Sequence, residues 1–139
     1  VLATSATKKL KLRIDMPVRK VLDVGNCAPD HASIKRLLTR HFDVEVHQTH
    51  AATDTLKLLR QQSVDLVLIN RKLDCDYSDG TEILIQLKAD PLLAKTPVMI
   101  ITNYSEHQDS AVALGAERGF GKLELQDPTT RQKLNAFLA

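Results

Sequence analysis

The sequence places a neutral side chain where a reactive one would be expected. Asn70 ends the apolar run Leu66–Ile69, which is long enough for a strand and too short for a buried helix. In an open α/β sheet, ligands and reactions lie just beyond the carboxyl ends of such strands. Because an amide oxygen is uncharged and a poor nucleophile, Asn70 cannot act as a carboxylate would. Thr102 and Lys122 end two later segments of the same kind.

The loop that follows this run is rich in acids and holds one of the two cysteines. Asp74, Asp76 and Asp79 have the spacing D-x-D-x-x-D-G, which is similar to part of a calcium-binding loop. The glutamate that closes such a loop is absent, so a metal site is only an alternative here. Cys27 follows the first predicted strand and Cys75 the third, over the same rim of the sheet. A redox-sensing disulfide is an alternative to two ordinary thiols, and it requires Cα atoms within about 7 Å.

These residues are positioned by five repeats of a strand followed by a helix. The predicted strands are 18–24, 44–46, 64–70, 97–102 and 119–122, and the predicted helices are 29–40, 51–61, 81–88, 105–114 and 128–138. Strands that alternate with helices predict a parallel sheet covered on both faces, with right-handed crossovers. We therefore expect an α/β, flavodoxin-like (βα)5 doubly wound fold with the strand order 2-1-3-4-5.

A basic arm precedes this predicted domain. Residues 1–20 hold six basic residues and one acid, a charge of +5, whereas the rest of the chain holds 13 basic and 16 acidic residues, a charge of −3. Residues 8–16 alternate charged and apolar side chains, which is typical of a strand. We expect residues 1–17 to be an arm or linker and 18–139 to be the domain. The arm could be an added strand or a contact with a partner or a second copy. The first residue is not methionine, which predicts an origin in a longer protein.

The composition excludes several classes of function. No apolar run approaches the ~20 residues that span a membrane, and no signal peptide is recognisable. The mildly acidic domain, without tryptophan and with few aromatic residues, argues against nucleic-acid binding. Two cysteines without a secretory signal predict a cytoplasmic location. The segment after the first strand does not fit the glycine-rich phosphate loop of a cofactor-binding enzyme.

Several small markers, in order and at matching spacing, resemble one family. They are Gly25-Asn26 after the first strand, Asn70 after the third, Asp79-Gly80 before the third helix, Thr102 after the fourth strand, Ala113-Leu114-Gly115-Ala116 before the fifth, and Lys122 after it. Over residues 19–139 the chain resembles the receiver domain of bacterial two-component response regulators. No marker is specific alone, but together they predict the receiver fold.

The resemblance implies a chemistry that this chain has largely lost. In the family, a carboxylate after the third strand accepts a phosphoryl group, two acids after the first strand hold Mg²⁺, and a Thr or Ser and a Lys contact the phosphoryl group. The corresponding residues are Asn70 for the acceptor, Gly25 and Asn26 for the acidic pair, and Thr102 and Lys122 for the contacts. Without the three carboxylates, we expect no Mg²⁺ or other cofactor, no phosphoryl transfer and no enzyme activity.

A lysine without its usual anions needs another partner, since an unpaired buried ammonium group is costly. For Lys122, the amide oxygens of Asn70 and Asn26 and the acids of the 74–79 loop are candidates. A small anion bound by Lys122 and Thr102 is a further alternative. The five histidines lack metal-site spacing and are predicted to be surface residues. They are His31, His41, His47, His50 and His107.

The favoured interpretation is a pseudo-receiver that signals through protein–protein contact. The resemblance implies that residues 104–138 bind a signalling partner or an output domain, and the arm at 8–16 could add a dimer or partner contact. One alternative is an active receiver that is phosphorylated on Asp74 or Asp76. Another is a receiver fold that responds to redox state or to a ligand. Neither nucleic acid nor membrane is an expected partner.

Overall fold

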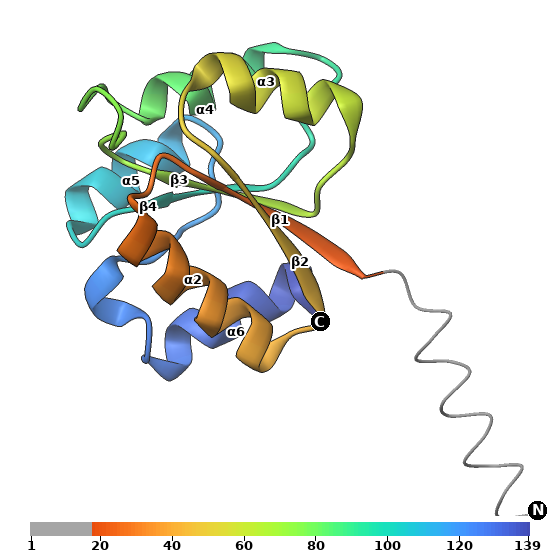
Figure 1. Ribbon diagram of the computed structural model, residues 1–139. Helices are drawn as coiled ribbons and strands as arrows, with labels where there is room; N and C mark the ends of the chain where they lie inside the picture. The colour runs from red at the N-terminus through yellow and green to blue at the C-terminus, as the bar shows by residue number, and fades with distance from the viewer. Residues whose placement is uncertain (1–17) are drawn as a thin grey trace, which may run out of the picture.

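A four-stranded parallel sheet, in the order β2-β1-β3-β4, forms the centre of the computed structural model, which describes residues 18–139 (Figure 1). The strands are β1 (Arg19–Val24), β2 (Val44–Thr49), β3 (Leu66–Asn70) and β4 (Val98–Ile101). The helices are α2 (Ala28–His41), α3 (Ala52–Gln61), α4 (Thr81–Ala89), α5 (Ser105–Ala113), the 3-10 turn η1 (Lys122–Glu124) and α6 (Pro128–Leu138). The α/β flavodoxin-like architecture predicted from the sequence is confirmed.

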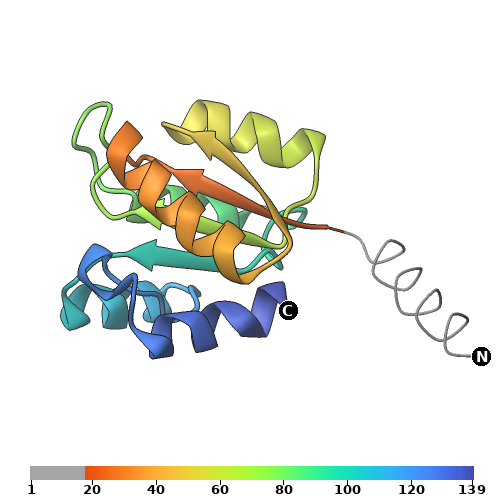
Figure 2. The same cartoon turned by 60° about the horizontal axis from the view of Figure 1, so that its bottom comes forward.

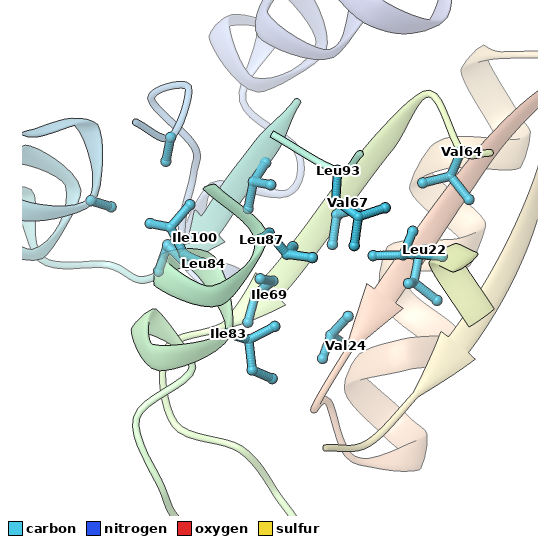
Figure 3. Close-up of a cluster of buried hydrophobic side chains, with 14 of the residues drawn as sticks. Leu22, Val24, Val64, Val67, Ile69, Ile83, Leu84, Leu87, Leu93 and Ile100 are labelled. Carbon is cyan, nitrogen blue, oxygen red and sulfur yellow. The ribbon is translucent and has the colours of Figure 1, made fainter. Parts of the chain in front are cut away.

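The helices form two layers on opposite faces of the sheet, as Figures 1 and 2 show. Side chains of α3, α4 and α5 pack with one face of the strands, in a cluster that includes Leu22, Ile69 and Leu84 (Figure 3). Side chains of α2 and α6 pack on the other face, around Leu68 and Phe120. Because β3 contributes to both clusters, its residues Leu66–Ile69 are completely buried, as the absence of alternation in this run predicted.

The register of the strands brings the candidate residues to one edge of the sheet. Val24 pairs with Thr49 of β2 and with Ile69 of β3, and Asn70 pairs with Ile101 of β4. The carboxyl ends of all four strands therefore meet, and the segments that follow β1, β3 and β4 lie side by side. Asp127 caps α6 as predicted, because its carboxylate accepts a hydrogen bond from the Thr129 backbone N–H at 2.9 Å.

The predicted fifth strand, residues 119–122, is wrong. This segment runs beside β4, and Glu117 and Thr102 donate backbone hydrogen bonds across the gap, to Val98 and Phe120 respectively. Between these two bonds, the buried side chain of Gln108 replaces the next backbone pair. Its Nε2 donates to the Ile100 carbonyl at 2.9 Å, and its Oε1 accepts from the Gly119 N–H at 2.8 Å. The side chain interrupts the ladder, so no continuous strand forms.

Gly119 is required for this arrangement, since a Cβ there would lie 2.5 Å from the Ile100 carbonyl oxygen. The remaining predicted elements agree with the structure to within a few residues at their ends. Within residues 18–139, no helix combines the length and the apolar character needed to cross a bilayer.

Candidate functional site

Asn70 connects the two loops at the edge of the sheet. Its Nδ2 group donates one hydrogen bond to the Lys72 carbonyl at 2.7 Å and a longer one to the Gly25 carbonyl at 3.3 Å. A carboxylate could form neither bond, because both partners are acceptors. The side chain at the position of the expected phosphoryl acceptor therefore acts as a donor that joins the loop after β1 to the loop after β3.

Gly25 occupies a position that a larger residue could not adopt unchanged. Its φ angle is +78°, in the left-handed region that favours glycine. A Cβ at this position would collide with the side chain of Leu73. The backbone is also fixed on both sides, since Gly25 N–H donates to Thr49 and the Gly25 carbonyl accepts from the Asp74 N–H, each at 2.9 Å. An acid at position 25 would be strained by this φ angle and would displace the Leu73 side chain.

Asn26 belongs to a buried polar cluster beneath the edge. Its Nδ2 group donates to Asp23 Oδ1 at 2.6 Å, and His31 Nδ1 lies 2.7 Å from Asp23 Oδ2. Asp23 is completely buried, which raises the pKa of its carboxyl group, although the hydrogen bonds from His31 and Asn26 oppose the rise. His31 is therefore a partner of a buried acid, and its prediction as a surface residue is wrong.

Lys122 pairs with an acid that the sequence did not indicate as its partner. Its Nζ lies 2.6 Å from Asp30 Oδ2, in the first turn of α2. This hydrogen bond lowers the pKa of Asp30. The two side chains are about one third exposed, at 32% and 38%, so the pair lies at the surface of the site rather than in the core. The predicted partners Asn70, Asn26 and the 74–79 acids are not the ones observed.

A pocket of about 320 Å³ lies between the ends of β3 and β4. Its walls are residues 70–72, 101–104, His107 and Lys122. It thus brings together three of the predicted site residues, Asn70, Thr102 and Lys122, but not Gly25 or Asn26. Thr102 is buried, and its hydroxyl accepts from the Tyr104 N–H at 3.3 Å and lies 3.4 Å from His107 Nδ1.

The residues at this edge do not fit Mg²⁺, the metal that the family implies. Magnesium sites use one or two carboxylates, and here Asn70 uses its amide to join backbone carbonyls while Gly25 has no side chain. Asn26 retains one buried oxygen, Oδ1, without a hydrogen-bond partner among residues 18–139. One neutral oxygen is not a magnesium site, and both oxygens of the nearby Asp23 are already hydrogen-bonded.

The two cysteines are free thiols at the same edge. Cys27 is half-buried and directly precedes α2, and Cys75 is exposed, with its Sγ 3.3 Å from the His50 carbonyl oxygen. Their pairing under oxidation stays a prediction. In the acid-rich loop, Asp76 accepts bonds from the Ser78 N–H and hydroxyl at 2.9 and 2.6 Å, which lower its pKa.

Sequence reasoning missed four residues that pair with polar groups at or near this edge, namely Asp23, His31, Asp30 and Gln108. One signal was available, because Asp23 interrupts the apolar run of β1 between Leu22 and Val24. An acid at such a position is rarely buried unless it is paired, so a search for its partner on α2 could have found His31.

The sequence model of the response regulator receiver domain matches residues 28–122, about two thirds of the chain. The chain therefore belongs to the response regulator receiver domain family. The match begins just after Gly25 and Asn26, so both acidic-pair positions lie outside it. No curated protein sequence matches the chain.

Solved structures of receiver domains have the same fold. The Francisella response regulator 1452 receiver domain superposes with a TM-score of 0.70 at 17% identity, over 86% of this chain and 96% of that one. Vibrio cholerae chemotaxis protein CheY4 gives a TM-score of 0.69 at 18% identity, over 88% and 100%. The Mn²⁺-bound response regulator Rcp1 gives 0.60 at 20% identity, over 74% and 78%. At these identities the likeness establishes the fold.

Proposed function

We propose that this receiver domain signals through protein–protein contact and is not phosphorylated. The observation that carries the proposal is the role of Asn70 as a hydrogen-bond donor. Its amide joins the carbonyls of Gly25 and Lys72, so the position that would receive a phosphoryl group holds the two loops together instead. The output of such a domain is a fixed surface, and the domain acts by binding rather than by catalysis.

Two further features support a conformation that is independent of phosphorylation. Lys122 is already paired with Asp30, so it would have to leave this partner to contact a phosphoryl group. Gln108 hydrogen-bonds to Ile100 and Gly119, which fixes the segment after α5 against β4. Switching proteins use an element that has two arrangements, and these contacts favour one of them.

The partner surface that we propose is the region 104–138. Half of the exposed large apolar side chains of the described chain lie there, namely Tyr104, Val112, Leu114 and Leu123. Leu123 is 87% exposed on η1. Large apolar side chains left in solvent are candidates for contact with another protein. The additional role of residues 8–16 as a dimer or partner contact, and a cytoplasmic location, remain predictions from the sequence.

The phosphorylation state can be tested directly by intact mass. We expect no gain of one phosphoryl mass when the protein is incubated with an acyl phosphate donor and Mg²⁺, because the acceptor and the metal ligands are absent. A phosphorylatable receiver domain treated in parallel shows that the donor is active. Acid-labile phosphate on this protein would contradict the proposal.

Two variants identify the residue if labelling does occur. Asp74→Asn and Asp76→Asn remove the alternative acceptors one at a time. Loss of label in either variant would establish the alternative function, an active receiver with a displaced acceptor. Asp76 is poorly suited to that role, because one of its oxygens already accepts both hydrogen bonds from Ser78.

A further inference from the structure

The pocket between β3 and β4 is lined by basic side chains and by no acid. Arg71 and Lys72 come from the loop after β3, His107 from α5, and Lys122 from η1. The other polar groups on its walls are neutral hydrogen-bonding groups, those of Asn70, Thr102, Asn103 and Tyr104. A volume of about 320 Å³ is at the small end of the range of ligand sites.

Arg71 and Lys72 carry positive charge that nothing in the described chain neutralises directly. Neither residue forms an ion pair with another residue of the range 18–139. Asp79 lies nearby but not on the pocket wall. Partial burial opposes the ionisation of Asp79, but hydrogen bonds from Thr81 and the charges of Arg71 and His107 lower its pKa. Since Lys122 is neutralised by Asp30, the excess charge of the pocket comes from Arg71 and Lys72.

The backbone under these two cations is held in place. The Arg71 N–H donates to the Ile101 carbonyl at 3.1 Å, and the Arg71 carbonyl accepts from the Gly80 N–H at 2.7 Å. The Lys72 carbonyl accepts from Asn70 Nδ2 at 2.7 Å. A site whose backbone is fixed before binding loses less conformational entropy when a ligand arrives. The Asn70 side chain thus also helps to position the cations.

We propose that this pocket binds a phosphate group reversibly and without a metal ion, either as free phosphate or as the phosphate of a small monoester. Arg71 and Lys72 supply the charge, and the Thr102 hydroxyl and the neutral side chains supply further hydrogen bonds. The proposal deepens the proposed function and rests on it. A carboxylate at position 70 would repel a free anion in this pocket, whereas the amide of Asn70 carries no charge.

The test is a titration of the protein with inorganic phosphate in EDTA, followed by calorimetry and by amide chemical shifts. We expect saturable binding, with the largest shifts at residues 71, 72 and 102. Arg71→Gln and Lys72→Gln should each weaken binding about tenfold, because each removes one charge-assisted contact. Their backbone hydrogen bonds are unaffected by the substitution, so both variants should fold.

Lys95→Gln is the matched control, since Lys95 is exposed before β4 at the opposite end of the strand, and it should bind phosphate as the wild type does. Glycerol 3-phosphate distinguishes the two sources of the anion, because tighter binding than phosphate would indicate a monoester ligand. Absence of saturable binding, or equal affinity in the wild type and both pocket variants, would overturn the proposal. Inorganic phosphate cannot donate a phosphoryl group. The binding titration can therefore fail while the test for covalent phosphorylation by intact mass succeeds, and the reverse.

Discussion

At the scale of single residues, an asparagine and an aspartate at position 70 would have opposite effects on their neighbours. The amide of Asn70 donates to two carbonyl oxygens, whereas a carboxylate would repel them. An amide at this position therefore differs from an acid in more than nucleophilicity. It also stabilises the contact between the loops after β1 and β3, which a carboxylate would need another group to stabilise.

We expect Asn70→Asp to remain unphosphorylated and to be less stable than the wild type. The new acid lacks metal ligands at 25 and 26, so we expect no phosphoryl mass with donor and Mg²⁺. The carbonyls of Gly25 and Lys72 lose a donor and face a negative charge, so the free energy of unfolding in urea should fall by about 1–3 kcal/mol.

Asn103→Asp is a matched control on the same edge. Asn103 uses its Oδ1 to accept from the Leu123 N–H at 3.1 Å, and an aspartate can accept the same bond. Its unfolding free energy should stay within about 0.5 kcal/mol of the wild type. Strong labelling of Asn70→Asp, or stability equal to that of the control, would show that the role assigned to Asn70 is wrong.

The contribution of the buried Asp23 to the free energy of unfolding should fall as pH rises. Burial raises its pKa above the ordinary value of 3.8, so between these two pKa values the folded state binds more protons than the unfolded state. The stability that Asp23 contributes is present below 3.8 and is lost as pH rises through the folded pKa. The difference in unfolding free energy between wild type and Asp23→Asn should therefore decrease from pH 4 upward, with a slope of at most about 1.4 kcal/mol per pH unit.

Asp127→Asn provides a control of opposite sign. The Thr129 N–H lowers the pKa of Asp127, so the stability that Asp127 contributes is present above 3.8 and is lost as pH falls through its folded pKa. Urea unfolding of both variants over pH 3–7 measures the two slopes. Parallel slopes for the two variants would mean that Asp23 does not titrate as its burial implies. His31 and Lys122 both act on the pKa of Asp23, and both remain in Asp23→Asn.

Residue types showed which of the expected positions carry no carboxylate, but not which contacts each side chain makes. Asn70, Thr102 and Lys122 could be assigned to one site because they follow strands. The partner of Lys122 could not, since Asp30 is 92 residues away in the sequence and looked like an ordinary acid of a helix first turn. A contact of this kind depends on how α2 and η1 approach each other in three dimensions.

At the scale of elements, the predicted fifth strand is absent because of one side chain. Gln108 bonds with its amide to both sides of the gap between β4 and Gly119. The apolar and glycine pattern of residues 119–122 correctly predicted a segment beside β4. It could not predict that a side chain from α5 would take the place of one backbone pair.

Gln108→Ala should lower the free energy of unfolding strongly, although it removes only one side-chain amide and its stem. It would leave the Ile100 carbonyl and the Gly119 N–H without partners in a buried place, and we expect a loss of about 3 kcal/mol in urea unfolding. Hydrogen exchange at the Gly119 amide should also become faster.

Gln132→Ala is the comparison, because Gln132 is exposed on α6, and its effect should be within about 0.5 kcal/mol. If Gln108→Ala were as stable as Gln132→Ala, the segment 117–121 would have to pair with β4 without the amide. Unchanged exchange at Gly119 would lead to the same conclusion.

At the scale of the whole molecule, the order of elements was predictable because short apolar runs mark the strands and a 3.6-residue period marks the helices. The parallel sheet, the order β2-β1-β3-β4 and the placement of helices on both faces follow from that order and from the handedness of crossovers. The buried network of Asp23, Asn26 and His31 was not predictable in this way, because it depends on the packing of α2 against β1.

The interrupted ladder beside β4 makes the two borders of the sheet unequal. On the outer side of β4, the Val98 carbonyl, the Ile100 carbonyl and the Thr102 N–H are all hydrogen-bonded, to Glu117, Gln108 and Phe120. The segment 117–121 and the Gln108 side chain therefore cover this border, and an uncovered border is what permits edge-to-edge association of sheets. Among the described strands, only β2 has an outer border at which the sheet could be extended. A strand supplied by the segment 8–16, by a second copy or by another protein would therefore have a single direction from which to join.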